Sequence, residues 1–135
     1  MRSTTPGPNG CPEAVAAGMT TLDAFLEALN RRDDAGLNAA FNFPHVRIAS
    51  GRVVTFPNRG DYTFEGFAAR AGDGWNETRW DDRTVIHAHP DKVHFAVQFS
   101  RWRADGSLIG RYQSIWIVTN QDGHWGVQAR SSFAS

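Results

Sequence analysis

Four extended runs follow one another in residues 78–133, which read TRWDDRTVIHAHPDKVHFAVQFSRWRADGSLIGRYQSIWIVTNQDGHWGVQARSSF. These runs lie near 78–89, 92–103, 108–120 and 124–133. Short turn sequences separate them, namely His89-Pro90-Asp91-Lys92, Asp105-Gly106 and Asp122-Gly123. Asp-Gly between alternating apolar runs is a strong hairpin signal, because a type I′ turn requires positive φ at both central residues. The stretch therefore predicts a four-stranded antiparallel meander.

The turns also predict the register of the meander. The Asp105-Gly106 turn pairs Phe99 with Tyr112, and the Asp122-Gly123 turn pairs Trp116 with Ala129 and Ser114 with Ser131. All three turns place one mostly apolar set on a single face: Ile86, Ala88, Val93, Phe95, Val97, Phe99, Tyr112, Trp116, Val118, Trp125, Val127, Ala129 and Phe133. A slip of one residue would scatter this set, so the agreement supports the register.

Helices and two short strands are predicted before the meander. A helix from Pro12 has Leu22, Phe25, Leu26 and Leu29 at the i, i+3, i+4, i+7 spacing of one face. Asp33 or Asp34 caps a second short helix, and Thr63 caps a third within TFEGFAARAG. Between them lie extended runs at 45–50 and 52–56. We expect a flexible tail over 1–11 and a single α+β domain over 12–135.

Composition excludes several classes of protein. The 135 residues include 14 basic and 14 acidic side chains, which cancel, whereas a nucleic-acid binder would normally be basic. The single cysteine, Cys11, excludes an internal disulfide and a cysteine-rich zinc site. No apolar run approaches the roughly 18 residues that a membrane span needs, and MRSTTPGPNG lacks the apolar stretch of a secretory signal. The expectation is a cytoplasmic protein that binds neither nucleic acid nor membranes.

The opposite face of the meander is mixed in character. Val85, Ala96, Ile115 and Ile117 form an apolar patch rimmed by arginine and glutamine. Such a patch is typical of a dimer interface, so we expect a homodimer through the back of the sheet. The alternative is a solvated sheet back.

The order of elements resembles the nuclear transport factor 2-like superfamily, which has the cystatin-like fold. Three segments, LDAFLEALNRRD, SIWIV and DGHWGVQARSSF, are similar to its SnoaL-like branch. The resemblance implies a cone-shaped half-barrel: three N-terminal helices packed on a strongly curved, mainly antiparallel sheet, in the order α-α-β-β-α-β-β-β-β. It also implies a pocket at the open end and dimerisation through the sheet back.

The best-understood enzymes of this superfamily are the ketosteroid isomerases, which use an Asp base and a Tyr and a protonated acid as oxyanion donors. Residues 42–60 and 108–120 contain no Asp or Glu, and Phe25 lies near the place of the Tyr. Isomerase chemistry by that apparatus is therefore not expected.

The predicted concave face nevertheless suggests a ligand pocket. Tyr112 can orient a ligand carbonyl or hydroxyl, since a buried phenol needs a hydrogen-bond partner. Ser114 and Ser131 are predicted cross-strand neighbours that either contact a ligand or only bond each other. The apolar lining is assigned to Phe99 and Trp116, and Trp75 is placed at the pocket mouth.

Two residues are candidate catalytic proton carriers. Asp82 is predicted opposite Phe99, where an apolar surrounding would raise its pKa; the alternative is a salt bridge to Arg101. His45 opens the first strand near the expected pocket mouth; the alternative is an exposed histidine at a strand end.

Three histidines, His87, His89 and His94, share the sheet back, and three imidazoles can bind zinc or nickel. A flat patch rarely converges three rings on one point, so we expect no metal and no cofactor. The sequence thus predicts a small-molecule-binding domain with an apolar aromatic pocket. It is either a cyclase, isomerase or dehydratase acting on a hydrophobic carbonyl compound, or a non-catalytic ligand-binding or assembly module.

Overall fold

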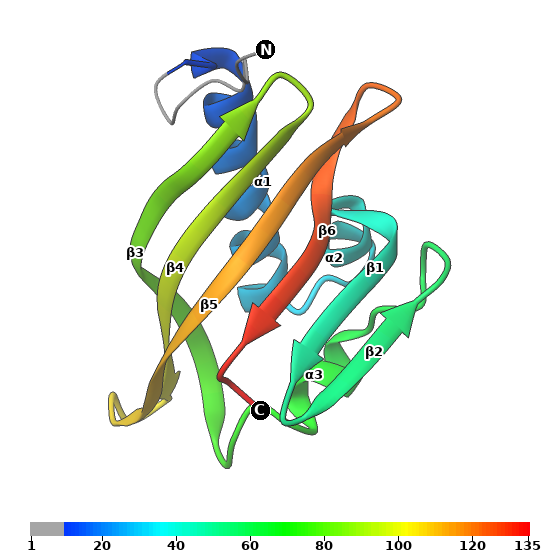
Figure 1. Ribbon diagram of the computed structural model, residues 1–135. Coiled ribbons are helices and arrows are strands. Elements are labelled where there is room, and N and C mark those ends of the chain that lie inside the picture. The colour runs from blue at the N-terminus through cyan, green and yellow to red at the C-terminus, as the bar shows by residue number, and fades with distance from the viewer. Residues whose placement is uncertain (1–9) are drawn as a thin grey trace.

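The structure, a computed structural model, describes residues 10–135 (Figure 1). The tail predicted over 1–11 lies outside the described residues except for Gly10 and Cys11. In chain order the elements are α1 Pro12–Asn30, α2 Asp34–Ala39, β1 Phe41–Ala49, β2 Arg52–Phe56, α3 Phe64–Ala68, β3 Trp75–His89, β4 Lys92–Arg103, β5 Leu108–Gln121 and β6 His124–Ser132. This order confirms the predicted α+β class.

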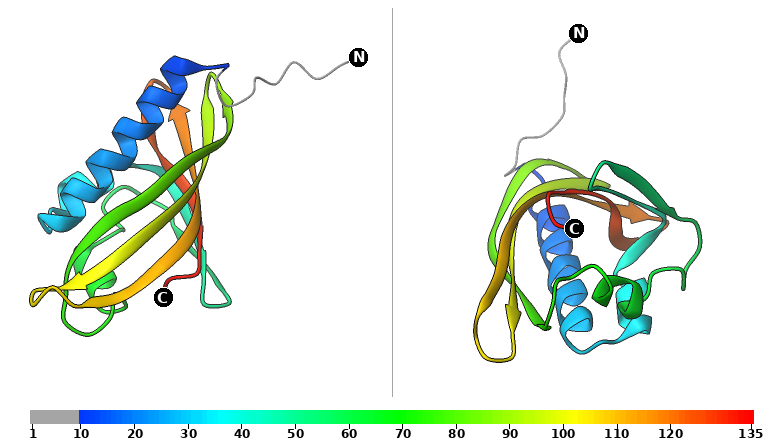
Figure 2. Two further views of the ribbon diagram at one scale, coloured as in Figure 1. Left: turned by 90° about the vertical axis from the view of Figure 1, so that its left-hand side faces the viewer. Right: turned by 90° about the horizontal axis from the view of Figure 1, so that it is seen from below.

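The six strands form one sheet in the order β2-β1-β6-β5-β4-β3. β1 pairs with β6 in parallel, and every other pair is antiparallel. Figure 2 shows the sheet curling around α1, which lies across its concave face. The helices and the sheet therefore enclose the space in which a ligand site can form.

One close steric contact and two hydrogen bonds fix the position of α1 against the sheet. A Cβ atom on Gly18 would lie 2.7 Å from the ring of Phe95, so glycine permits the close approach of α1 to β4. At the end of α1, the Asn30 side chain donates to the main-chain oxygen of Thr78 and accepts from its nitrogen, both at 2.9 Å. These bonds join the end of α1 to β3 and limit the width of the enclosed space.

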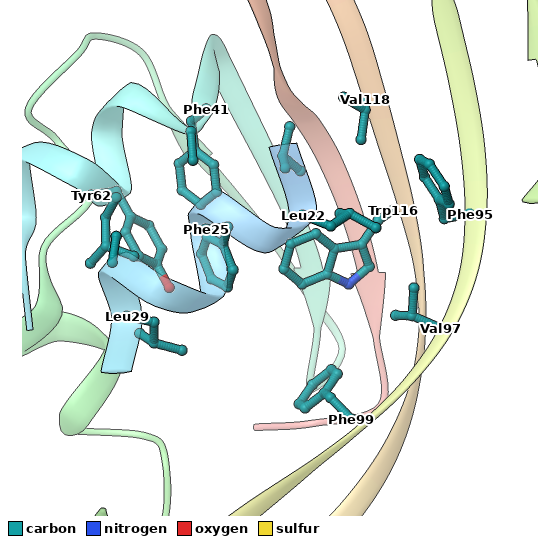
Figure 3. Packing of buried hydrophobic residues seen from close by; sticks show 14 of the residues in the cluster. Leu22, Phe25, Leu29, Phe41, Tyr62, Phe95, Val97, Phe99, Trp116 and Val118 are labelled. Carbon is teal, nitrogen blue, oxygen red and sulfur yellow. The ribbon is translucent and has the colours of Figure 1, made fainter. Parts of the chain in front are cut away.

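An aromatic core fills most of the space beneath α1. Figure 3 shows Phe25 of α1 between Trp116 on one side and Phe41 and Tyr62 on the other. The ring centroids of Phe25 lie 5.0 Å from Trp116 and 5.5 Å from Phe41. Edge-to-face and offset pairs at such distances add to the stabilisation from burial.

The predicted register is correct between β4 and β5, but between β5 and β6 it is correct only as far as Val118, which pairs with Val127. Phe99 pairs with Tyr112, as expected. A β-bulge beside Ile117 and Val118 shifts the next pairs, so Trp116 faces Arg130 rather than Ala129. A bulge adds one residue to one strand and therefore reverses the face of every residue beyond it. Arg130 consequently points to the concave face, while Ser131 and Phe133 are exposed.

Bulges in β3 also overturn two predicted placements. Asp82 pairs with Gln98 instead of Phe99, because the register shifts between Trp80 and Asp82. A second shift, beyond Val85, places Val85 opposite Phe95. Val85 therefore packs against the core. It is not part of the apolar patch expected on the back of the sheet, which is the convex face.

Candidate functional site

A cavity lies between α1 and the concave face of the sheet. Its apolar wall comes from Phe25, Leu29, Phe67, Phe99 and Trp116. The cavity volume is about 20 Å³, enough for one or two water molecules at roughly 10–15 Å³ each. The cavity is thus a narrow site with room for a small chemical group.

Four arginines from separate parts of the chain line the same cavity: Arg47 of β1, Arg70 after α3, Arg101 of β4 and Arg130 of β6. We call it the arginine cavity. Arg47, Arg101 and Arg130 are only 8%, 3% and 6% exposed, and within residues 10–135 every buried side chain that is charged at neutral pH is one of these three. No Asp or Glu side chain of the described chain lines the cavity. The site therefore has a concentrated positive charge without a carboxylate side chain to offset it.

Main-chain oxygens at the end of the chain satisfy part of this cluster. Arg47 Nη2 donates to Ala134 O at 3.1 Å, and Arg101 Nη2 and Arg70 Nη1 donate to Ser135 O at 3.3 and 3.1 Å. The last residues thus hold one side of the arginines in place.

His45 positions Arg130. The Nδ1–H group of His45 donates to Val127 O at 2.9 Å, and its Nε2 accepts from Arg130 Nε at 3.0 Å. Because Arg130 can only donate, Nε2 must keep its lone pair, which assigns the proton to Nδ1. The imidazole is fully buried and stacks on Phe41 at a centroid distance of 4.0 Å. It has neither a free lone pair nor access to solvent.

The surroundings shift several pKa values in one direction. Burial, then the charge of Arg130, lowers the pKa of His45 to about 3. Burial, then the charge of Arg70, lowers the pKa of Arg47 and of Arg101 to about 10. Burial alone would raise the pKa of Tyr62, but the charges of the neighbouring arginines outweigh it and lower that pKa. Burial is the main cause for His45, Arg47 and Arg101, and the positive charges of neighbouring arginines contribute to all four shifts; an anion would relieve that part.

Three buried N–H groups at the cavity have no hydrogen-bond partner. They are Arg130 Nη2, Arg101 Nε and Trp80 Nε1, and no other buried side-chain nitrogen or oxygen of residues 10–135 is unpartnered. All three residues line the arginine cavity. A buried donor without an acceptor costs about 1–3 kcal/mol, and more when it is charged. Three such donors at one cavity indicate a site for an acceptor-rich ligand.

The low pKa of His45 predicts an acid-sensitive fold. Its folded-state pKa lies below the unfolded value of 6.5, so the unfolded chain binds an extra proton as the pH falls from 6.5 towards 3. The free energy of unfolding should therefore fall by about 3 kcal/mol from this group between pH 7 and pH 4. Urea denaturation of wild type and His45→Gln over that range measures it, and the variant should lose less stability. Parallel curves for the two proteins would contradict the neutral, buried imidazole.

Some of the ligand-binding residues predicted from the sequence line the cavity, and others do not. Phe99, Trp116 and Ser114 line the cavity, and Ser114 Oγ accepts from Trp116 Nε1 and donates to Ser131 O. Tyr112 lies on the concave face as predicted, but it contacts the Arg101 guanidinium at 5.1 Å and does not line the cavity. Trp75 packs on Phe67 at 5.1 Å and is likewise outside the lining.

Neither predicted proton carrier reaches the cavity. Asp82 is exposed beside a groove of the convex face, and its Oδ2 accepts from Thr84 Oγ1 at 3.0 Å, so both its placement opposite Phe99 and the bridge to Arg101 are wrong. His45 is buried rather than exposed at a strand end, and it lies behind Arg130. Ser131, predicted beside Ser114, is exposed, and Ser132 takes its place in the lining.

The arginines were the residues that sequence reasoning missed. Arg101 has the concave parity of Phe99, but the sequence suggests no role for it other than a salt bridge to Asp82. Arg47 shares the parity of His45 within an apolar strand, which was an available signal. Arg130 had none, because the bulge in the β5–β6 ladder cannot be located from the alternation alone.

The histidines of the convex face form pairs rather than a cluster. His87 Nδ1 and His94 Nδ1 lie 3.1 Å apart, while His89 contacts Asp91 at 3.0 Å. Over residues 10–135, no group of three His, Cys, Asp or Glu side chains is arranged to hold a metal ion. No helix in this range is both long enough and apolar enough to span a bilayer.

Comparison with solved structures identifies the class of fold. An NTF2-like protein with a cystatin-like fold from Novosphingobium aromaticivorans is similar, with a TM-score of 0.73, 12% identity and coverage of 91% of this chain and 82% of the other. A cystatin-like protein of unknown function from Nostoc punctiforme has a TM-score of 0.70 and 13% identity, and 87% of each chain is covered. A ketosteroid isomerase-like protein from Erwinia carotovora atroseptica has a TM-score of 0.68 and 16% identity, with 90% and 96% covered. The fold is thus of the NTF2-like, cystatin-like class.

The family follows from the sequence. The profile of the family described as NTF2-like protein (DUF6841) matches residues 19–132, and the chain belongs to this family. No curated protein matches the chain. At the identities above, the structural likeness establishes the fold and not an activity.

Proposed function

We propose that this protein binds a small anion in the arginine cavity. The observation that carries the proposal is the set of three unpartnered buried donors, Arg130 Nη2, Arg101 Nε and Trp80 Nε1, at one cavity. An anion supplies acceptors for these groups and lowers the electrostatic cost of the arginines at the same time.

The lining favours binding over proton transfer. It consists of arginines, hydroxyl groups and apolar side chains, and the described residues contribute no Asp, Glu or His to it. A base would need a free lone pair, whereas the Nε2 lone pair of His45 is engaged by Arg130. Of the two functions expected from the sequence, the geometry supports a ligand-binding module, with an anion in place of a neutral hydrophobic carbonyl compound.

Thermal unfolding tests this function. The full chain is heated in sodium butyrate, phosphate, sulfate or chloride at matched ionic strength. A ligand at about 100 times its Kd adds about 2.7 kcal/mol to the free energy of unfolding, which for a domain of this size raises the Tm by about 8 °C. At least one oxyanion should raise the Tm well above its value in chloride. Equal Tm values in all four salts would refute anion binding.

A second copy of the chain is the partner we propose for the convex face. Ile115 is 40% exposed and pairs with the half-buried Ala96, and Phe133 is 85% exposed. Ala96, Ile115 and Phe133 also line a groove of this face, so it has both a projecting ring and a recess. A surface with both features can be self-complementary, as a two-fold interface requires.

We expect the wild-type protein to be a dimer that the substitution Ile115→Arg dissociates. Sedimentation velocity at micromolar concentration should show wild type as a dimer and Ile115→Arg as a monomer, because the new charge would be buried without a partner. Val53→Arg, at a 68% exposed residue of β2, is the matched control and should remain dimeric. A monomeric wild type would rule out the interface.

A further inference from the structure

We infer that the ligand of the arginine cavity is a short-chain carboxylate rather than a tetrahedral oxyanion such as phosphate or sulfate. This inference rests on the proposed function and names the chemical class of the anion. Its basis is the set of buried donors without a partner, the apolar part of the wall and the small volume.

The buried donors without a partner can be satisfied by the two oxygens of a carboxylate. Some of the arginine N–H groups are engaged: Arg101 donates through Nη1 to Ala71 O and through Nη2 to Ser135 O, and Arg130 donates through Nε to His45. The fully buried side-chain nitrogens that have no acceptor here are Arg101 Nε, Arg130 Nη2 and Trp80 Nε1. Two carboxylate oxygens offer about four acceptor sites, which three donors can largely satisfy. Arginine and a neutral N–H together are a common carboxylate environment.

The apolar part of the wall disfavours a tetrahedral oxyanion. Phe25, Leu26, Leu29, Phe67 and Phe99 line the cavity next to the arginines. Phosphate or sulfate presents oxygens in four directions, so some would face these side chains without a donor, which is costly. A carboxylate presents both oxygens on one side and an apolar substituent on the other. The substituent matches the wall.

The volume limits the length of the buried substituent. The cavity volume is about 20 Å³, room for one or two water-sized groups, so it takes the carboxylate itself, and the short chain lies along the apolar wall towards the opening. Leu26, Arg70, Trp80 and Ser132 are the half-buried members of the lining, so the cavity comes closest to solvent beside these residues. Each methylene buried there should raise the affinity about fourfold, until the chain reaches this opening.

Trp80 provides a matched test of the donor set. Trp80→Phe removes the indole N–H and keeps an aromatic ring against Trp116, whose centroid lies 5.2 Å from that of Trp80. Because Trp80 Nε1 has no partner, the substitution breaks no hydrogen bond of the free protein. Trp102→Phe is the control, since Trp102 Nε1 donates to Ser100 Oγ and Trp102 lies outside the lining.

The experiment is titration calorimetry of the full chain with acetate, propionate, butyrate, phosphate and sulfate at matched ionic strength, with butyramide as the neutral analogue. Affinity should rise from acetate to butyrate by about tenfold or more. Phosphate and sulfate should bind at least tenfold more weakly than butyrate, and butyramide should show no binding. Trp80→Phe should lower the butyrate affinity about tenfold, while Trp102→Phe should leave it unchanged.

The outcomes separate this inference from the proposed function. Phosphate or sulfate binding more tightly than every carboxylate would overturn the carboxylate assignment and leave anion binding intact. Equal affinities for acetate and butyrate would overturn the apolar contact. An unchanged butyrate affinity in Trp80→Phe would overturn the donor set. The absence of binding by any anion would overturn both the inference and the proposed function.

Discussion

Arg130→Gln should weaken anion binding by about 100-fold, the largest functional effect expected from a single substitution in this chain. Arg130 is 6% exposed, and its Nη2 is one of the three unpartnered donors of the arginine cavity. A buried hydrogen bond from a charged donor contributes up to about 3 kcal/mol, and the substitution also removes the charge that faces the ligand. Titration calorimetry with butyrate measures the loss.

A surface arginine provides the control. Arg111→Gln makes the same change of charge at an exposed residue of β5 that pairs with Asp81 at 3.2 Å. Its affinity for butyrate should stay within about twofold of wild type, because solvent screens a charge outside the cavity. Equal losses in the two variants would show that only net charge matters, and the arginine cavity would no longer be the site.

Glutamine at residue 130 also protects the test from a folding artefact. Its amide can still donate towards Nε2 of His45, so the buried imidazole keeps a possible partner. Circular dichroism monitors whether the variant is folded. Should Arg130→Gln fail to fold, Arg101→Gln removes a second unpartnered donor, Arg101 Nε, and should lower the affinity for butyrate to a similar degree.

Trp116→Ala should lower the free energy of unfolding by about 4 kcal/mol, the largest stability effect we expect. The indole is 3% exposed and packs edge-on against Phe25 at 5.0 Å and Trp80 at 5.2 Å. It also lies 5.2 Å from the guanidinium of Arg130. Alanine would leave a large void under α1 and remove support for the cavity, as urea denaturation can measure.

Trp102 offers a matched comparison. Both indoles donate to a serine two residues earlier, Trp116 to Ser114 and Trp102 to Ser100. Trp102, however, is half-buried and lies beside the guanidinium groups of Arg79 and Arg111. Trp102→Ala should therefore lower the free energy of unfolding by about 1–2 kcal/mol, at most half as much as Trp116→Ala. Similar losses in both variants would mean that the aromatic cluster under α1 is not the main core.

The positions of the elements could be predicted because their signals are local. The Asp-Gly turns gave the pairing of β4 with β5, and Phe99 does face Tyr112. The caps at Asp33 and Thr63 accept from Gly36 N and Gly66 N, as the short helices require. Each of these features depends on a few neighbouring residues, whose preferences are readable in the chain.

The site was less predictable because bulges decide it. One bulge between Ile117 and Val118 moves Arg130 into the interior and Ser131 to the surface. Another, at Trp80–Asp82, moves Asp82 out of the concave face. Side chains alternate between the two faces of a strand, so one extra residue reverses the faces of all residues beyond it. Trp80 thus takes the place opposite Phe99 that was predicted for Asp82, and Arg130 takes the concave side that was predicted for Ser131.

The sequence by itself determined the order of helices and strands, the meander and the apolar face, because hydrophobic periodicity and turn chemistry act over short distances. Only the tertiary structure decided the chemistry of the cavity. Arg47, Arg70, Arg101 and Arg130 come from four separate parts of the chain and meet because the sheet curls around α1 (Figure 2). Their convergence, and the absence of an acidic side chain among the described residues of the lining, depend on long-range register and curvature that no local pattern encodes.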